Sequence, residues 1–183
     1  MEILEMDCEK EVRPWLPQFV SSVVASGWSI IVRDNEGQLA AVRLNLLELK
    51  DSNIGMHELV DATNQPKMTI VLELLNQLSS SFNFYTMHNV DQVLHLVMVA
   101  VSEQFGRRGI ASRLAQLSLR RARKEGIRVV VVEGANMFAA KLLLKNGFEL
   151  VNQILYNDFE YKNSKPLTTT GIHQRIVLLS QTL

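Results

Sequence analysis

Apolar and polar positions follow two periods along the chain, and each period predicts a different kind of element. Apolar side chains three or four positions apart predict amphipathic helices, and short runs dense in aliphatic and aromatic residues predict strands. Helices are expected over residues 9–26, 67–78, 109–125 and 136–146. Strands are expected over residues 28–33, 39–47, 94–101, 127–133, 148–161 and 175–180, with polar loops over 48–65 and 162–171.

Several element boundaries have a local cause. Pro14 and Pro17 interrupt the first helical pattern, because proline lacks the N–H group that a helix interior needs. The segment 34–37 (Asp-Asn-Glu-Gly) predicts a hairpin turn, since its glycine can take a positive φ. Gly126 and Gly147 follow the last two helical patterns and predict where those helices stop.

The middle of the chain predicts the fold class. The strand over 94–101 is almost continuously apolar, which predicts a central strand covered on both faces. The next helix is expected to turn one apolar face inward, formed by Ile110, Leu114, Leu117 and Ala122. The order of elements predicts an α/β (α+β) architecture, a mixed sheet of about six strands flanked by helices, rather than a Rossmann pattern. A length of 183 residues fits one domain spanning 1–183.

Composition narrows the class of protein. An apolar fraction of 47% beside 21% charged residues supplies a sizeable core and excludes a wholly disordered chain. The single cysteine, Cys8, can form neither an internal disulfide nor a zinc site, so no metal is expected and a cytoplasmic location is the default. No apolar run reaches the ~18 residues of a membrane span, and the acidic start lacks the layout of a signal peptide.

The segment 99–112 carries the clearest chemistry. A buried strand runs into a turn with two glycines and two arginines, and then directly into a helix. Gly106 and Gly109 let the backbone approach a ligand closely, and the N–H groups that open a helix suit a phosphate or pyrophosphate. Arg107 and Arg108 would add positive charge beside it. The alternative is a solvated basic turn that caps an ordinary strand–helix unit.

This segment resembles the cofactor loop of the GNAT N-acetyltransferases, which carry Gln/Arg-x-x-Gly-x-Gly/Ala at such a junction. Gly109 and Ala111 fill the last two positions, whereas Gly106 and Arg107 are transposed relative to the family pattern. A second GNAT pattern, Asn-x-x-Ala-x-x-Leu-aromatic-x-x-x-Gly-Phe, is matched everywhere except at its aromatic position, which is Leu143. The matching residues are Asn136, Ala139, Leu142, Gly147 and Phe148.

Within this family the chain is most similar to the arylalkylamine N-acetyltransferases and their invertebrate relatives. The similar pieces are residues 42–45, 94–111, 147–148 and 154–159. The resemblance implies the GNAT fold, with a mostly antiparallel sheet that is splayed at the cofactor site. It implies acetyl-coenzyme A as cosubstrate and a small primary amine, an arylalkylamine, as acceptor. We expect a monomer or a homodimer.

The resemblance also implies which residues bind the cofactor. Backbone amides of the strand would hold the thioester and pair with pantetheine, and those of the turn would hold the pyrophosphate. The implied residues are Val99, Ala100, Val101, Gly106, Arg107, Arg108, Gly109, Ile110, Ala111, Ser112, Asn136 and Ala139.

The candidate base is His95. Strand alternation would place it on the face of residues 97, 99 and 101, and an ordinary histidine pKa of ~6.5 suits proton transfer at neutral pH. Glu9 and Glu11 are the alternatives. The candidate acid is Tyr156. The family positions that elsewhere hold tyrosine or serine are apolar in this chain, which leaves open a homologue that binds coenzyme A with little turnover: Leu143, Ala135 and Ala139.

A different class of protein is a nucleic-acid-binding module built on the basic helix. Its cations would be Arg107, Arg108, Arg113, Arg120, Arg121, Arg123 and Lys124. Lys+Arg and Asp+Glu both total 19, and a net charge of zero argues against a dedicated nucleic-acid binder. A solvated helix face above an acidic cofactor explains these cations equally well.

Overall fold

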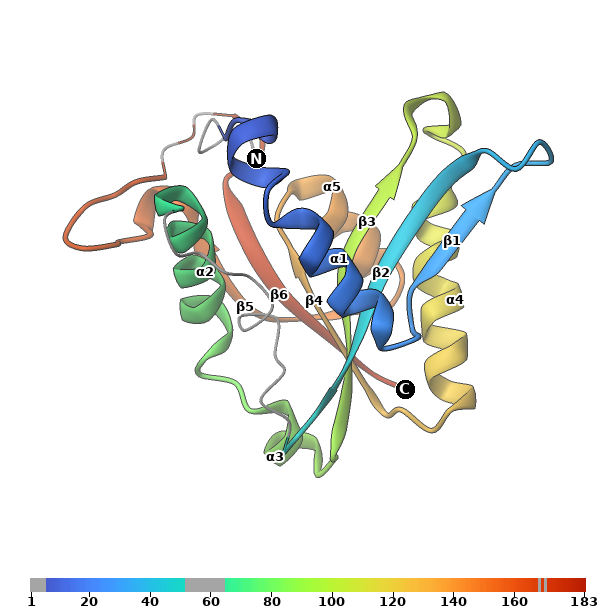
Figure 1. Cartoon of the computed structure of the whole chain (residues 1–183). Coiled ribbons are helices and arrows are strands. Elements are labelled where there is room, and N and C mark those ends of the chain that lie inside the picture. Colours follow the sequence, from blue (N-terminus) through green and yellow to red (C-terminus); the bar gives the residue numbers. More distant parts are fainter. Residues whose placement is uncertain (1–5, 52–64, 168, 170) are drawn as a thin grey trace.

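Six strands form one sheet in the order β1-β2-β3-β4-β6-β5 (Figure 1). The computed structural model describes residues 6–51, 65–167, 169 and 171–183. The strands are β1 (Ile30–Arg33), β2 (Leu39–Leu49), β3 (Gln92–Val101), β4 (Val129–Gly134), β5 (Glu149–Leu155) and β6 (Arg175–Thr182). The α-helices are α1 (Leu16–Ala25), α2 (Pro66–Ser79), α3 (Phe84–His88), α4 (Ile110–Lys124) and α5 (Met137–Lys145). The expected mixed α/β architecture is confirmed.

Local signals set most of these boundaries. The N-terminal helical pattern is divided as predicted, into a π-helical turn over Cys8–Val12 and α1, which has Pro17 in its first turn. In the hairpin, the Gly37 N–H donates to the Asp34 carbonyl at 3.1 Å, and Gly37 has φ +83. Helix α3 was not predicted, although Asn83 caps it by accepting a hydrogen bond from the Thr86 N–H. Most of the expected loop over 48–65 lies outside the described residues.

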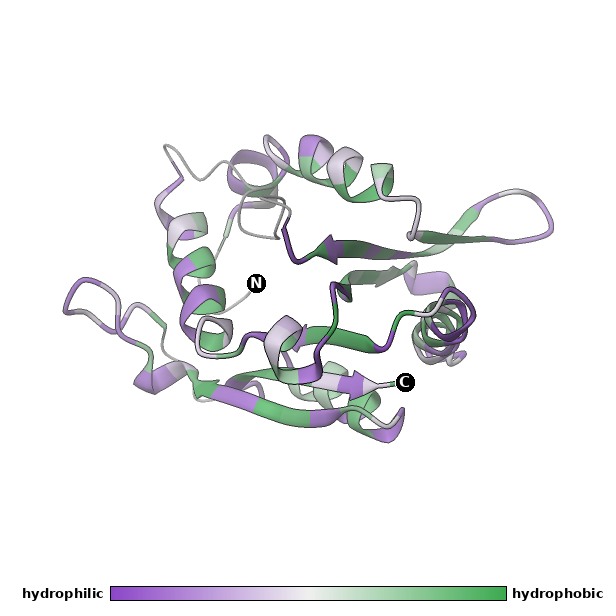
Figure 2. Cartoon of the chain, turned by 90° about the horizontal axis from the view of Figure 1, so that it is seen from below, coloured by the Kyte–Doolittle hydropathy of each residue, from purple (hydrophilic) through white to green (hydrophobic). Residues whose placement is uncertain are grey.

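The helices cover both faces of the sheet. Helices α4 and α5 pack on one side, against apolar side chains that include Leu94, Leu96 and Val130. Helices α1 and α2 pack on the other side, α2 against Val93 and its neighbours and α1 against β2. We call these sides the α4 face and the α1–α2 face. Figure 2 shows largely apolar strands between helices whose polar residues lie mainly on their outer sides.

The predicted inward face of α4 is partly wrong. The helix buries Leu114, Ala115, Ser118, Leu119 and Ala122, whereas the Leu117 side chain is 45% exposed. The buried stripe follows spacings of one, three and four residues along the helix, and this places position 117 on its solvent side. None of the helices in the described part of the chain has the length and apolar character needed to cross a membrane.

A group of polar side chains, linked by hydrogen bonds, is buried on the α4 face. Asn45, fully buried, donates from Nδ2 to the Trp28 carbonyl at 3.0 Å and to Ser118 Oγ at 2.9 Å. Its Oδ1 accepts from Arg43 Nε at 3.3 Å. The Arg43 guanidinium is buried too, and its Nη2 has no hydrogen-bond partner among the described residues. Burial lowers the pKa of Arg43 to about 10.

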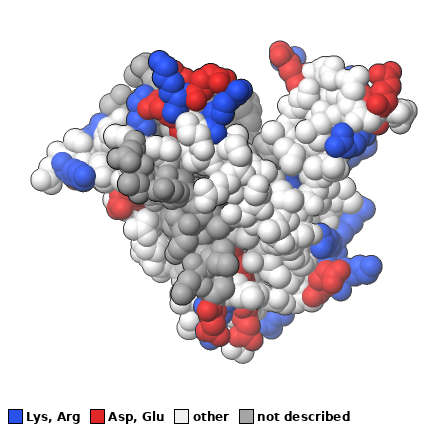
Figure 3. Space-filling view, viewed as in Figure 1, with Lys and Arg blue, Asp and Glu red and all other residues white. Residues whose placement is uncertain are grey.

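The sheet opens between its two central strands. β3 and β4 are the parallel pair, and they pair at Leu94–Val130 and His95–Val131. β3 continues to Val101 and β4 to Gly134, and within the described residues these continuations do not pair with each other. The strands separate in Figure 1, and Figure 3 shows a notch in the molecular outline above this point. The expected splay is confirmed, and we call the space between the two strand ends the slot.

The opening also corrects the expectation that residues 94–101 are covered on both faces. Residues 93–96 are buried, but beyond them the strand alternates between half-buried and exposed positions, and Met98 is 39% exposed. A β-bulge accompanies the change. Leu44 pairs with Met98 and Asn45 with Leu96, so Val97 has no partner on β2. An extra residue in one strand reverses the faces of all residues that follow it.

Candidate active site

The turn between β3 and α4 has an unusual backbone. After a 3₁₀ turn over Glu103–Phe105, Arg107 has φ +59 and Gly109 has φ +74. Both values lie in the left-handed region, which favours glycine and is uncommon for arginine. Gly109 is the N-cap of α4, and the Arg113 N–H donates to its carbonyl at 3.0 Å.

The turn leaves a run of backbone donors open. Among the described residues, no acceptor takes the N–H groups of residues 107–112. Gly106 differs, because its N–H donates to the Glu103 carbonyl at 2.9 Å. The Gly106 amide, which was expected to take part in anion binding, therefore already has an acceptor within the turn. The open N–H groups and the positive end of the α4 dipole together suit a pyrophosphate.

Some side chains around the turn already make contacts within the protein. Arg107 and Arg108 are exposed, and Arg108 donates from Nη2 to the Gln104 carbonyl at 3.1 Å and lies over the Phe105 ring. The Ser112 hydroxyl accepts from Asn146 Nδ2 at 3.2 Å, which leaves the backbone N–H of Ser112 for a ligand. Two exposed cations beside open amides fit a diphosphate.

The strand contacts come from Val99, Ala100 and Val101. These residues pair with Arg43, Val42 and Ala41 of β2 along one edge. Their other edge borders the slot, where β4 no longer pairs with β3. An unpaired strand edge offers hydrogen bonds to an extended ligand segment. The position of these residues therefore fits the expected pairing with a pantetheine arm.

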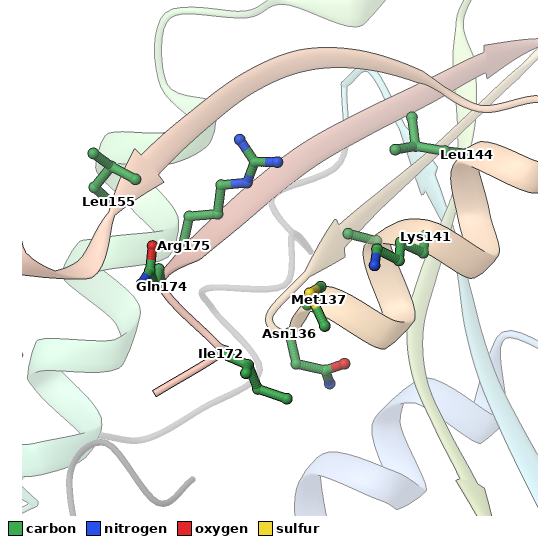
Figure 4. A pocket seen from close by; sticks show the side chains of 9 residues that line it. Asn136, Met137, Lys141, Leu144, Leu155, Ile172, Gln174 and Arg175 are labelled. Carbon is green, nitrogen blue, oxygen red and sulfur yellow. The ribbon is translucent and has the colours of Figure 1, made fainter. Parts of the chain in front are cut away.

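Asn136 and Ala139 form the start of α5. Asn136 Oδ1 accepts from the Ala139 N–H at 2.9 Å, which caps the helix. The Ala139 amide is therefore used by the Asn136 side chain. Asn136 also borders a pocket of about 280 Å³ between α5 and the ends of β5 and β6 (Figure 4). Its lining comprises Asn136, Met137, Ala140, Lys141, Leu144, Leu155, Ile172, Gln174 and Arg175, and includes no residue of the turn.

His95 lies between two carboxylates at the closed end of the slot. Its Nδ1 is 2.9 Å from Glu48 Oε1 on β2, and its Nε2 is 2.5 Å from Glu133 Oε2 on β4. Carboxylates only accept hydrogen bonds, so both ring nitrogens carry protons and the ring is an imidazolium. Burial alone would lower the pKa of His95, but Glu133 and Glu48 outweigh it and raise this pKa to about 10. We call these residues the Glu48–His95–Glu133 triad.

The expected role of His95 as a base is not supported, for two reasons. At neutral pH its ring already holds both protons and has no lone pair to accept another. Its side chain also lies on the opposite face of the sheet from Val99 and Val101, with which it was expected to share a face. His95 pairs with Leu46 on the α1–α2 face, whereas the bulge at Val97 turns Val99 and Val101 to the α4 face.

The triad gives a pH-dependent contribution to stability. The folded pKa of His95, about 10, lies above the ~6.5 of an unfolded histidine, so the contribution is complete below pH ~6.5 and is lost as the pH rises through about 10. We expect the free energy of unfolding in urea to fall by up to ~1.4 kcal/mol per pH unit between about pH 7 and 9. His95→Gln should flatten this slope. An equally steep slope in the variant would assign it to other groups.

The other two catalytic candidates, Glu9 and Tyr156, make contacts away from the slot. Glu9 is exposed and pairs with Arg13 at 3.0 Å on the surface of the N-terminal turn. Tyr156 is buried, and its hydroxyl donates to the Ala135 carbonyl at 2.6 Å. Burial raises the pKa of Tyr156 to about 12, which suits a structural hydrogen bond better than proton transfer.

Glu11, the remaining alternative, lies closer to the body of the molecule. It accepts hydrogen bonds from the Asp7 N–H at 2.7 Å and from Lys67 of α2 at 3.0 Å. These two contacts, the Asp7 amide first, lower the pKa of Glu11. A lowered pKa makes this carboxylate a weaker base than an ordinary glutamate.

Sequence reasoning missed Glu48 and Glu133. Both are charged residues that follow apolar residues within a strand, Glu48 after two leucines and Glu133 after four valines, and charged side chains in buried strands are rarely left without a partner. That signal marks them as paired, although it does not say with what. No group of His, Cys, Asp and Glu side chains in the described residues is placed to hold a metal ion.

Comparison with known proteins identifies the family. Residues 29–148, well over half of the chain, match the model of the acetyltransferase (GNAT) family. Arylalkylamine N-acetyltransferase 2 of Aedes aegypti has a similar structure, with a TM-score of 0.85 at 21% identity over 92% of this chain and 79% of that one. Polyamine N-acetyltransferase of Drosophila melanogaster has a TM-score of 0.73 at 19% identity, over 90% of this chain and 79% of that one. The C-terminal condensation domain of Ebony, solved with beta-alanyl-dopamine, has a TM-score of 0.79 at 17% identity, over 100% of this chain and 85% of that one. The turn, the slot and the family match agree, and the chain belongs to the GNAT acetyltransferases.

Proposed function

We propose that this protein transfers the acetyl group of acetyl-coenzyme A to a small primary amine, and that the amine is an arylalkylamine. The observation that carries the proposal is the run of open N–H groups at residues 107–112 beside the unpaired edge of β3. The first fits a pyrophosphate and the second fits an extended pantetheine arm. Both lie at the carboxyl ends of the parallel strands, where ligands of open α/β sheets bind.

Different residues of the chain would bind different parts of acetyl-coenzyme A. The amides of residues 107–112 would hold the pyrophosphate, and Arg107 and Arg108 would add charge beside it. The backbone of Val99, Ala100 and Val101 would orient the thioester, and its free N–H groups would stabilise negative charge on the carbonyl oxygen. When bound, acetyl-coenzyme A supplies the activated acetyl group.

The acceptor class rests on similarity and on chemistry together. Structures similar to this one are named as arylalkylamine and polyamine N-acetyltransferases, at identities that establish the fold alone. An arylalkylamine combines an aromatic body with one primary amine, and the aliphatic, partly exposed residues of β3 beside the slot offer an apolar surface for such a body. A cytoplasmic location and a monomer or homodimer belong to the same proposal.

The test is release of coenzyme A thiol from acetyl-coenzyme A across an amine panel of 2-phenylethylamine, tyramine, tryptamine and agmatine. Turnover with arylalkylamines above agmatine supports the proposal. Tight coenzyme binding without turnover on any amine would favour the weakly active homologue instead. That alternative has a structural basis, because Leu143 is buried in the core and Ala135 and Ala139 carry no hydroxyl that could protonate the thiolate.

The arginines of the turn give a separate prediction. We expect Arg107→Ala with Arg108→Ala to weaken coenzyme A binding by about 2 kcal/mol, roughly 1 for each exposed charge-assisted contact. The loss should shrink as salt is added. The matched control is Arg123→Ala with Lys124→Ala, which removes two exposed cations from the other end of α4. Titration calorimetry with coenzyme A measures the affinity of both double variants. Equal losses of affinity would mean that only the overall charge of the protein matters.

A further inference from the structure

The Glu48–His95–Glu133 triad occupies a defined place in the sheet. His95 is the last residue of β3 that pairs with β4, and its partner is Val131. Glu133 lies two residues further along β4, where the strands have separated. The hydrogen bond from His95 to Glu133 therefore spans the closed end of the slot, and the bond to Glu48 ties β2 to the same point.

The triad also lies on the side that an acceptor must use. The open amides lead into α4, so a cofactor held there approaches the slot from the α4 face. A nucleophile needs access to the thioester carbon from the other side. His95 lies with Leu46 on the α1–α2 face, and Glu133 shares a face with Val129 and Val131, which pack under α2. The three charged side chains thus border the acceptor side of the slot.

The triad contains two carboxylates and one imidazolium, in surroundings that include the apolar cluster under α2. The Glu48 and Glu133 side chains keep 18% and 14% of their surface exposed, whereas His95 keeps 5%. Tyr85 of α3 also faces Glu48, and burial together with that carboxylate raises the pKa of Tyr85 to about 12, so it stays neutral. A partly exposed carboxylate in such surroundings attracts a cation.

We propose that His95 is a positioning residue, which holds the Glu133 carboxylate at the acceptor side of the slot, and that Glu133 binds the ammonium group of the acceptor amine there. The inference rests on the proposed function and names the part of the site that selects a cationic acceptor. A primary ammonium offers three N–H donors and one positive charge, which complements the triad in both respects. Neutral acceptors of the same shape lack that charge.

The first experiment uses the unmodified protein saturated with coenzyme A, so that no turnover occurs. Titration calorimetry compares 2-phenylethylamine with 2-phenylethanol, which has nearly the same shape and no charge. We expect the amine to bind at least ~10-fold more tightly at neutral pH, as one charge-assisted contact would give. Equal affinities would overturn the proposal, whatever the variants do.

The second experiment removes the carboxylate. Glu133→Gln should weaken binding of 2-phenylethylamine by ~10–30-fold and leave 2-phenylethanol and coenzyme A within about twofold. Glu160→Gln is the matched control, because Glu160 is an exposed surface carboxylate paired with Lys165 at 4.0 Å. It should change none of the three affinities. Equal weakening of the amine and the alcohol by Glu133→Gln would contradict a contact with the ammonium.

The third experiment addresses His95. In a protein with ¹⁵N-labelled histidine, both ring nitrogens of His95 should give protonated, imidazolium-type signals near neutral pH. His95→Gln should raise KM for 2-phenylethylamine by ~10-fold with kcat nearly unchanged. A fall in kcat at constant KM would make His95 a participant in proton transfer instead. No coenzyme binding by the wild type would refute the proposed function, whereas intact acetyl transfer without preference for cations would refute this inference alone.

Discussion

Gly109→Val should reduce coenzyme A affinity by about 10²-fold or more while the protein remains folded. Gly109 has φ +74, a conformation that a β-branched residue adopts only with strain. Among the described residues no heavy atom lies within 4 Å of a Cβ added there, so the effect comes from the backbone and not from a clash. To relieve the strain the turn must change its conformation, and the open N–H groups of residues 107–112 then no longer converge. Titration calorimetry with coenzyme A measures the loss.

Gly126→Val provides a matched control at the other end of the same helix. Gly126 has φ +76 and, like Gly109, nothing within 4 Å of an added Cβ. Both variants should therefore lose a similar amount of stability, about 1–3 kcal/mol in urea unfolding. Only Gly109→Val should lose the coenzyme. If both variants lost affinity alike, the turn would have no special part in binding.

Asn45→Ala should lower the free energy of unfolding by about 3–5 kcal/mol, measured by urea denaturation at neutral pH. The change removes two hydrogen bonds that hold Trp28 and Ser118 and the contact that Arg43 makes through Nε. The Arg43 guanidinium would then be a buried cation without its acceptor, and such groups are costly.

Arg43→Met tests the same explanation with the opposite expectation. It removes a buried cation whose Nη2 already lacks a partner, and replaces it with an apolar side chain of similar length. Stability should change by less than about 1 kcal/mol or increase. A large loss in Arg43→Met would mean that the guanidinium itself stabilises the fold, and the cost of Asn45→Ala would then need another cause.

The sequence predicted those features that depend on local signals. The Gly37 hairpin and the helix ends before Gly126 and Gly147 each follow from one residue type at one place in the chain, and each is confirmed. The family patterns located the turn in the same way, because they too are short and contiguous. Their match over residues 29–148 confirmed the family.

What the sequence did not predict depends on register. The bulge at Val97 lies in an unbroken aliphatic run, with no glycine or proline to mark it, so simple alternation put His95 on the face of Val99. The partners of His95 are 47 and 38 residues away on two different strands. Without the register of those strands, His95 was assigned an ordinary pKa and a position on the face of Val99, and the structure shows neither.

The place of β6 in the sheet has a consequence for folding. β6 lies between β4 and β5, although it follows both in the chain. While the chain emerges from the ribosome, β4 and β5 must wait for residues 175–182 before either has its antiparallel neighbour. Until then both strands present unpaired edges to the cell, and β4 contains a run of four valines. This half of the sheet should therefore fold late and depend most on chaperones, and substitutions that slow the docking of β6 should reduce soluble yield before they reduce activity.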